Sequence, residues 1–228
     1  MSTLPHTLKN GFFALVIGLF FVANSQAQAN IQPPDEIIQV NTVKMLRSIN
    51  EHRPEIKKTP EKLTSLVEDI ILPHLDFITA SKIVMGKYWR RAKKEQKIKF
   101  IRQFRLLLLR FYSSALSEYL KSNDKDLKLD LIKYFPSKLK DGDTSITIRG
   151  EVGQEKGPGI PIFYRMHLTK KGWKIFDVSV EGISMITTYK NNFATQLKTD
   201  GIDALILSLE EKNKSMLANN SSDNKKTN

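Results

Sequence analysis

The hydrophobic positions along the chain change their spacing twice. From 33 to 120 they recur every three or four residues, which is typical of amphipathic helices. From 127 to 180 they alternate with polar positions, which is typical of strands with one buried face. From 183 to 217 the helical spacing returns. Helices followed by a sheet and then by more helices predict an α+β fold.

Prolines and small polar residues indicate where the first helices begin. Segments 33–50 and 59–72 each begin next to proline, and a shorter helix is predicted over 75–86. Thr59 is expected to cap the second helix, because its hydroxyl can accept a hydrogen bond from a free backbone N–H. Asp76 is interpreted in the same way, as a cap and not as a catalyst.

The longest periodic segment, 93–120, predicts a wide-faced amphipathic helix. One face is expected to carry Phe104, Leu108, Phe111 and Tyr112. Such a face can cover a sheet as solid core, or it can line a cavity with its aromatic side chains. The pattern leaves both roles open.

About four strands are predicted between 127 and 180, separated by turns that contain glycine. Strands that follow one another through short turns form a twisted antiparallel sheet, here packed against helices on one face. The residues expected on the inward face include Ile148, Ile162, Tyr164, Met166, Val178 and Val180.

The first 29 residues resemble an export signal that is cleaved. Lys9 precedes an apolar run over 11–23, about 13 residues, which is shorter than the roughly 20 that a membrane-spanning helix needs. Ala27 and Ala29 supply a cleavage pattern, and a retained membrane anchor is the alternative. We expect 30–217 to form a single α+β domain with an N-terminal helical part, and 218–228 to be a disordered polar tail.

The formal net charge of +12 and the absence of cysteine narrow the ways in which the domain can be stabilised and the kinds of partner it can bind. Without disulfides an ordinary hydrophobic core must stabilise the domain. For an exported basic protein, anionic lipid head groups, an acidic protein or an acidic ligand suit the charge better than nucleic acid does. Charge alone does not choose among these.

The chain is poor in catalytic patterns. The stretch around Ser184 lacks the second glycine of a nucleophile elbow, so Ser184 is interpreted as the N-cap of the following helix. No spacing of His, Cys or acidic residues resembles a metal site, and no glycine-rich phosphate loop precedes a helix. We therefore predict a protein that is not an enzyme and needs no cofactor.

Three stretches together resemble the MlaC family of phospholipid-binding proteins, also called toluene-tolerance auxiliary proteins. They cover 74–119, 157–168 and 172–197, and the last is followed by GIDALILSL. The resemblance implies a fold like the nuclear-transport-factor-2 cone, with acyl chains in an apolar pocket and the head group outside. It also implies a periplasmic carrier of Gram-negative bacteria, which passes phospholipid between an outer-membrane lipoprotein-porin complex and an inner-membrane ABC transporter complex and so maintains outer-membrane lipid asymmetry.

An apolar interior suits such a carrier, because about 30 methylenes in water would cost on the order of 25 kcal/mol at about 0.8 kcal/mol each. Solid core is the alternative at each position, since periodicity does not distinguish a packed interior from a hollow one. The residues expected to bind lipid are Phe104, Leu108, Phe111, Tyr112, Ile148, Ile162, Tyr164, Met166, Val178, Val180, Ile183, Met185 and Tyr189.

A basic cluster precedes the long helix and includes Arg90, Arg91 and Lys94. Phospholipid phosphate or an anionic membrane surface could meet the protein here, and a solvated face is the alternative. Two other functions also stay open. An enzyme of the cone fold would need a polar pair such as His167 and Asp177 inside its pocket, and an adaptor would bind proteins through an apolar groove without a ligand.

Overall fold

The structure is a computed structural model that describes residues 31–154 and 157–226, with side chains described up to Ala218. All elements belong to the second of two units of the chain, residues 32–228. The expected export signal at 1–29 lies outside the described residues.

Five antiparallel strands form one sheet, in which each strand pairs with the next along the chain. The predicted α+β class with an antiparallel sheet is confirmed. Tyr164 is the central partner, opposite Ile148 on one side and Val178 on the other. The strands are β1 (Ile132–Tyr134), β2 (Ser145–Val152), β3 (Ile160–Thr169), β4 (Gly172–Val180) and β5 (Ile183–Ser184).

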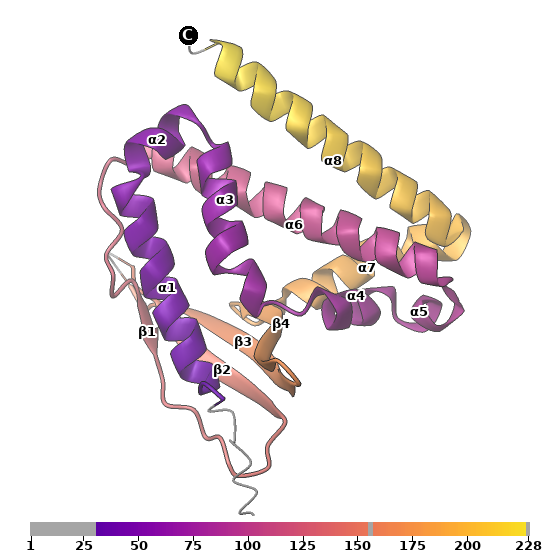
Figure 1. Ribbon diagram of the computed structural model, residues 1–228, viewed down its shortest axis with the longest axis horizontal. Coiled ribbons are helices and arrows are strands. Elements are labelled where there is room, and N and C mark those ends of the chain that lie inside the picture. The colour runs from indigo at the N-terminus through magenta and orange to yellow at the C-terminus, as the bar shows by residue number, and fades with distance from the viewer. Residues whose placement is uncertain (1–30, 155–156, 227–228) are drawn as a thin grey trace, which may run out of the picture. The chain divides into compact units, whose positions relative to one another are not determined.

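Helices precede and follow the sheet, in the order that the sequence predicts (Figure 1). They are α1 (Pro34–Glu51), α2 (Arg53–Lys58), α3 (Glu61–Ile70), the 3₁₀ turn η1 (Leu72–His74), α4 (Phe77–Met85), α5 (Lys87–Arg91), α6 (Lys94–Ser122), α7 (Met185–Thr199) and α8 (Gly201–Lys226).

Helix ends differ from the sequence prediction in three places. Helix α2 occupies a stretch expected to be loop, and α3 begins after Pro60 without the side-chain cap expected from Thr59. Helix α8 continues to Lys226, so most of the stretch expected to be a disordered tail is helical. No glycine or proline follows Gly201, so the sequence contains no strong helix breaker there.

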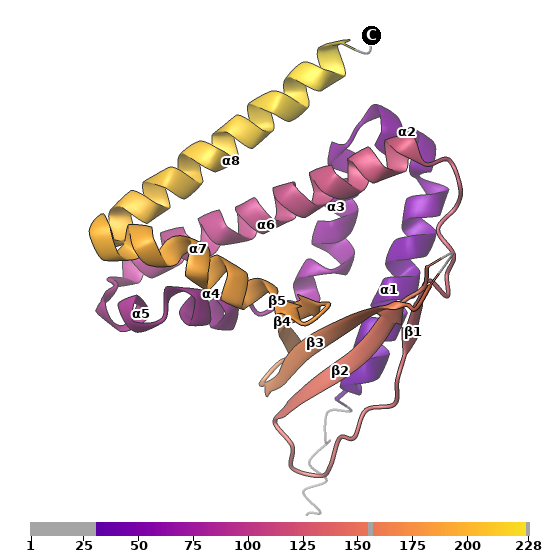
Figure 2. The same ribbon diagram turned by 180° about the vertical axis from the view of Figure 1, so that it is seen from behind.

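Helix α1 covers one face of the sheet. It lies in front of β1 and β2 in Figure 1 and behind them in Figure 2, which shows the molecule from the other side. Ile37 and Ile38 of this helix pack with Ile148, Met166 and Trp173 of the sheet in one buried cluster. The opposite face carries exposed polar residues, so the sheet has one covered face, as its alternating pattern predicts.

Two further clusters bury the helices against one another. One lies among α1, α2, α3 and the C-terminal end of α6, with Ile56, Leu63 and Leu120 completely buried. The other joins α4, α6, α7 and α8 around Phe100 and Phe104. Because α6 takes part in both clusters, it connects α1, α2 and α3 to α4, α7 and α8.

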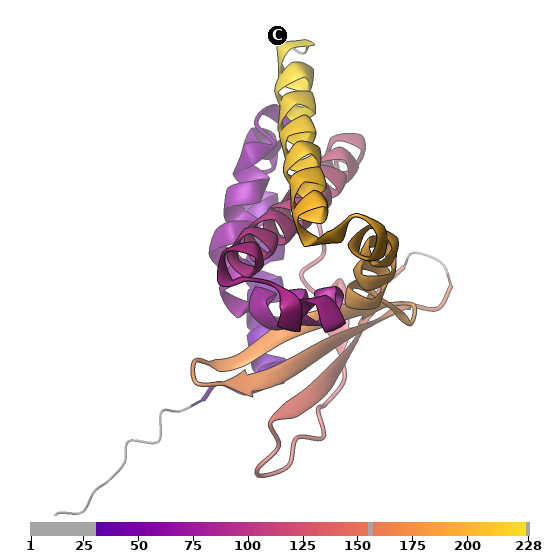
Figure 3. The same cartoon turned by 90° about the vertical axis from the view of Figure 1, so that its right-hand side faces the viewer.

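The edge of the sheet at β4 meets α4 and α7, which pack against each other (Figure 3). The backbone N–H of Asp76 donates to the carbonyl of Ile175 in β4 at 2.7 Å, which fixes the start of α4 beside this edge. The Asp76 side chain accepts from the N–H of Thr79 at 2.9 Å, so the predicted cap is confirmed. The helices and the strand edge thus enclose the region where the candidate site lies.

Candidate functional site

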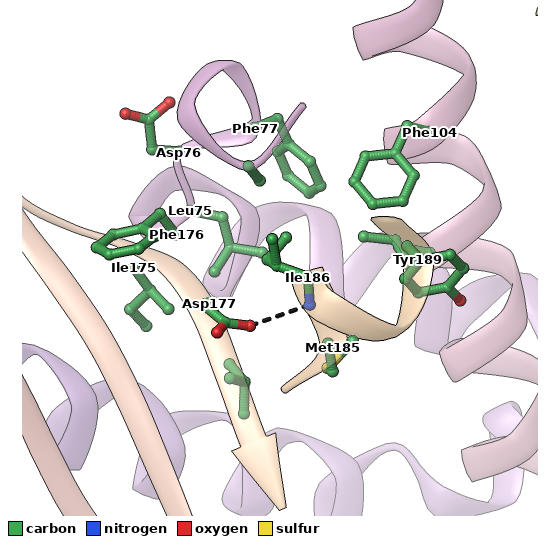
Figure 4. Close-up of a pocket in the computed structure, with 13 residues that line it drawn as sticks. Leu75, Asp76, Phe77, Phe104, Ile175, Phe176, Asp177, Met185, Ile186 and Tyr189 are labelled. Atoms are coloured by element: carbon green, nitrogen blue, oxygen red, sulfur yellow. Dashed lines mark hydrogen bonds between the residues drawn. The ribbon is translucent and has the colours of Figure 1, made fainter. Parts of the chain in front are cut away.

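A buried carboxylate holds the beginning of α7 against β4. Asp177 accepts a hydrogen bond from the Ser184 hydroxyl at 2.7 Å and one from the Ile186 N–H at 3.1 Å, the bond drawn in Figure 4. Arg165 contributes a longer contact of 3.4 Å from its Nη1 atom. The Asp177 side chain is fully buried. These bonds fix the first turn of α7, and with it Met185, at the sheet edge.

Ser184 caps α7, because its hydroxyl oxygen accepts from the Thr187 N–H at 3.1 Å. The predicted N-cap role is therefore confirmed. Before it, Glu181 and Gly182 both have positive φ, 51° and 81°. Two such residues in succession make the tight turn that joins neighbouring antiparallel strands. This turn returns the chain from β4 to β5 and directs it into α7.

A small apolar cavity of about 70 Å³, the inner cavity, lies between α4, α6, β4 and α7 (Figure 4). The ring of Phe104 meets the ring of Tyr189 edge to face, with centroids 5.2 Å apart. The lining consists of Leu75, Asp76, Phe77, Ala80, Phe104, Leu108, Ile175, Phe176, Asp177, Val178, Met185, Ile186 and Tyr189.

A larger hollow of about 590 Å³, the outer groove, lies between α6, α7, α8 and the β4–β5 turn. Several of its apolar side chains are exposed, with Ile183 67% and Phe111 48% accessible. Exposed apolar groups beside one hollow are typical of a binding surface. The lining consists of Leu107, Phe111, Tyr112, Val180, Glu181, Ile183, Met185, Thr188, Tyr189, Asn192 and Lys212.

Two side chains, Met185 and Tyr189, line both hollows and so lie between them. The hydroxyl groups of Tyr189 and Tyr112 interact. Burial, with a smaller effect of Tyr112, raises the pKa of Tyr189 to about 12, and burial also raises the pKa of Tyr112. Both phenols are therefore neutral at physiological pH, which keeps this boundary uncharged.

The model of the family described as "MlaC protein" matches residues 39–211 of the chain. The chain belongs to the MlaC family.

Curated relatives of this MlaC family member come from two bacteria. The toluene tolerance protein ttg2D of Pseudomonas putida is 28% identical over 173 residues, which are 75% of this chain and 76% of the relative. The intermembrane phospholipid transport system binding protein MlaC of Haemophilus influenzae is 28% identical over 181 residues, 78% of this chain and 81% of the relative.

A solved structure is also similar to this family member. It is the phospholipid-binding protein from Ralstonia solanacearum in complex with a phospholipid, with a TM-score of 0.69 and 27% sequence identity. The match covers 80% of this chain and 98% of that one. The two proteins therefore share the fold over most of their lengths.

Nine of the thirteen residues expected to bind lipid line one or both hollows of this MlaC family member. Met185 and Tyr189 line both. Phe104, Leu108 and Val178 line the inner cavity. The remaining four line the outer groove, and they are Phe111, Tyr112, Val180 and Ile183.

Four expected wall residues, Ile148, Ile162, Tyr164 and Met166, line neither hollow. Ile148 and Met166 are completely buried in the cluster beneath α1. Tyr164 packs against the same cluster, and burial raises the pKa of its hydroxyl. The alternation identified the covered face, but it did not indicate that α1 fills the space above it.

The long helix also differs from its expected pattern. Phe111 and Tyr112, which are expected on the same face as Phe104, are 48% and 44% accessible, while Leu107 and Leu109 are buried. The packing partners of α6 change along the helix, because Phe104 and Leu107 pack with α4, α7 and α8 whereas Leu120 packs with α1, α2 and α3. Phe111 and Tyr112 lie between these two regions and line the outer groove.

The sequence analysis missed several lining residues. Leu75, Phe77 and Ala80 reach the inner cavity from α4 and the segment before it. Their contact with β4 joins parts of the chain far apart in sequence, which no local pattern reveals. Ile186 could have been found, because it follows Met185 directly. Lys212 enters the outer groove from α8 and gives it a cation.

The residues of the basic cluster, Arg90, Arg91 and Lys94, are exposed on α5 and the start of α6. They line neither the inner cavity nor the outer groove. A third hollow, of about 460 Å³, lies nearby and includes Lys87 and Lys190 in its lining. The structure thus separates this basic surface from the outer groove.

His167 and Asp177, the example of a polar pair given for an enzyme, each bond to a different partner. His167 bonds to Asp76 through Nε2 at 2.8 Å, while Asp177 bonds to Ser184. Burial alone would raise the pKa of Asp76, but hydrogen bonds from Thr79 and His167 outweigh burial and lower it. Each carboxylate therefore has a structural task, one at the start of α4 and the other at the start of α7.

Within residues 31–154 and 157–226, no group of three or more His, Cys or acidic side chains could hold a metal ion. None of the helices described there combines the length and the apolar character needed to cross a bilayer.

Proposed function

We propose that this MlaC family member is a periplasmic phospholipid carrier. It encloses acyl chains in the inner cavity and the outer groove and shuttles lipid between membranes to maintain outer-membrane lipid asymmetry. The observation that carries the proposal is the pair of adjoining apolar hollows that share Met185 and Tyr189. Membership of the family and the lipid-bound relative of the same fold add support.

The size and lining of the outer groove suit acyl chains. Its volume of about 590 Å³ falls within the range of about 300–1,000 Å³ typical of ligand sites. The bound chains would be in contact with side chains such as Phe111, Val180 and Ile183 instead of water. Because each buried methylene contributes about 0.8 kcal/mol, enclosure offsets most of the cost of taking a lipid out of a bilayer.

A carrier of this kind needs no reaction, and we propose that the chain is not an enzyme. The polar groups at the inner cavity, Asp76 and Asp177, are hydrogen-bonded to neighbouring protein groups. These hydrogen bonds hold the beginnings of α4 and α7, so both carboxylates support the walls of the site. Since bilayer and pocket are both apolar, the direction of transfer comes from the differential affinity of partner complexes.

The partners in the proposal are an inner-membrane ABC transporter complex and an outer-membrane lipoprotein-porin complex. The basic cluster with Arg90, Arg91 and Lys94 would face anionic lipid or an acidic partner surface during transfer. Its separation from the outer groove argues for contact with the membrane or the partner, and not with the head group of the enclosed lipid. Lys212 is the cation positioned for that head group.

The test is lipid uptake by the purified mature chain. After delipidation and incubation with phospholipid vesicles, the re-isolated protein is extracted with organic solvent and its phospholipid content is measured. About one phospholipid per chain is expected. Protein that stays free of lipid would overturn the carrier function and favour a ligand-free adaptor.

Val178→Asp should lower the uptake strongly, because it introduces a charge into the wall of the inner cavity. Leu207→Asp is the matched control, since Leu207 is 56% accessible and lines neither hollow. Full uptake by folded Val178→Asp would contradict the placement of the site.

A further inference from the structure

The two hollows differ greatly in capacity. The outer groove, of about 590 Å³, is several times larger than the inner cavity, of about 70 Å³. A phospholipid with two 16-carbon chains carries about 30 methylene and methyl groups, and one with two 8-carbon chains carries about 14. The short lipid therefore needs about half the apolar space of the long one, and the long lipid has the greater need of the inner cavity.

The boundary between the hollows consists of Met185 and the ring of Tyr189. Figure 4 shows this ring beside that of Phe104. It meets Phe104 at 5.2 Å and Phe193 at 5.7 Å between centroids, and its hydroxyl interacts with Tyr112. Because Met185 and Tyr189 line both hollows, the inner cavity and the outer groove adjoin at these two side chains.

The backbone beneath the ring is fixed, whereas the ring itself is accessible. Asp177 and the Ser184 cap hold the first turn of α7, so this part of the helix is anchored to the sheet. Tyr189 is only half-buried, and its hydroxyl partner Tyr112 is 44% accessible. Displacement of the Tyr189 ring therefore removes one of the two side chains that separate the hollows.

We propose that Tyr189 determines how deeply an acyl chain enters and thereby which chain lengths the protein holds well. With the ring between the hollows, the outer groove accepts short chains. Long chains displace the ring, and their ends occupy the inner cavity and the space that the ring vacates. This inference rests on the proposed carrier function and assigns a specificity-determining residue within it.

The chain-length dependence of exchange tests the inference. The full mature chain is loaded with dioctanoyl- or dipalmitoyl-phosphatidylethanolamine, and the rate of uptake of each lipid is measured for the wild type and for Tyr189→Ala. Uptake of the dipalmitoyl lipid should rise roughly tenfold in the variant, because two aromatic contacts no longer oppose entry. Uptake of the dioctanoyl lipid should change less than about twofold, because its shorter chains need less of the space behind the ring.

Tyr189→Phe keeps the ring contacts and removes only the hydroxyl, so it tests the inference if the alanine variant fails to fold. It should accelerate uptake of the long lipid about threefold, the effect of one lost hydrogen bond. Tyr119→Phe is the matched control, since Tyr119 is exposed on the same helix as Tyr112 and its hydroxyl accepts from the exposed side chain of Asn123 at 3.1 Å. Its rates should equal those of the wild type for both lipids.

Failure of the inference and failure of the carrier function give different results. If the wild type holds one lipid per chain but the Tyr189 variants accelerate both lipids equally, or neither, the chain-depth role is overturned and the carrier function stands. If the wild type takes up neither lipid, the carrier function itself is overturned.

Discussion

Removal of the Asp177 carboxylate should loosen the wall of the site by freeing the start of α7. In Asp177→Ala the Ser184 hydroxyl loses its acceptor at 2.7 Å and the buried Ile186 N–H loses its acceptor at 3.1 Å. Hydrogen bonds to charged groups contribute about 1.5–3 kcal/mol each. The Arg165 contact adds little, because the Arg165 side chain is 49% accessible and its charge is screened.

Since neighbouring bonds do not add fully, we predict a loss of about 3 kcal/mol in the free energy of unfolding. Asp177→Asn should lose about half as much, because its amide oxygen still accepts one bond. The measurement is urea unfolding of the lipid-free protein. With a slope of about 3 kcal/mol per molar, the midpoint of the alanine variant should fall by about 1 M.

Asp200→Ala provides the control at the opposite end of α7. Asp200 is exposed, and its stability effect should stay within about 0.5 kcal/mol. If Asp177→Ala unfolds at the same urea concentration as the wild type, the carboxylate does not hold α7. The reasoning that links β4 to the wall of the site would then be refuted.

Three further predictions follow from the site and its surroundings. Val178→Asp should reduce the phospholipid content of the purified protein several-fold while Leu207→Asp leaves it unchanged, as lipid phosphorus per chain will report. Because the pKa of Asp76 is lower in the folded protein, its carboxylate stabilises the fold above the unfolded-state pKa of about 3.9, and this contribution is lost as the pH falls through the lower folded-state pKa. Asp76→Asn should therefore flatten the acid limb in a plot of unfolding free energy against pH. An unchanged slope would contradict the hydrogen bonds assigned to Asp76. Charge reversal of Arg90 and Arg91 should slow transfer to anionic vesicles at low salt and not at high salt, and equal rates across a salt series would exclude a role for this surface.

Local signals in the sequence predicted most of the elements and the caps at Asp76 and Ser184, but they missed α2 and wrongly predicted a cap at Thr59. Ser184 caps α7 because a hydroxyl at a strand-to-helix junction meets free N–H groups wherever the chain folds this way. The alternation in β2 and β3 likewise identified the covered face, on which Ile148 and Met166 are buried. These features depend on neighbours within a few residues, which the sequence displays directly.

The sequence did not indicate which residues of that face pack in solid core and which line a hollow. Ile148 and Val178 follow the same alternation, yet α1 covers the first and the inner cavity adjoins the second. Which helix covers which strand is decided by long-range packing. Phe77 enters the cavity wall for the same reason, and its own surroundings in the sequence carry no signal for it.

The central claim is that the hollows on either side of Tyr189 hold the acyl chains of a phospholipid. Native mass spectrometry of the mature chain, with and without Val178→Asp, tests this claim most directly. The wild type is expected to carry the added mass of one phospholipid, and the folded variant is expected to have the mass of the bare chain. A wild type without added mass after incubation with vesicles, or equal lipid on both proteins, would contradict it.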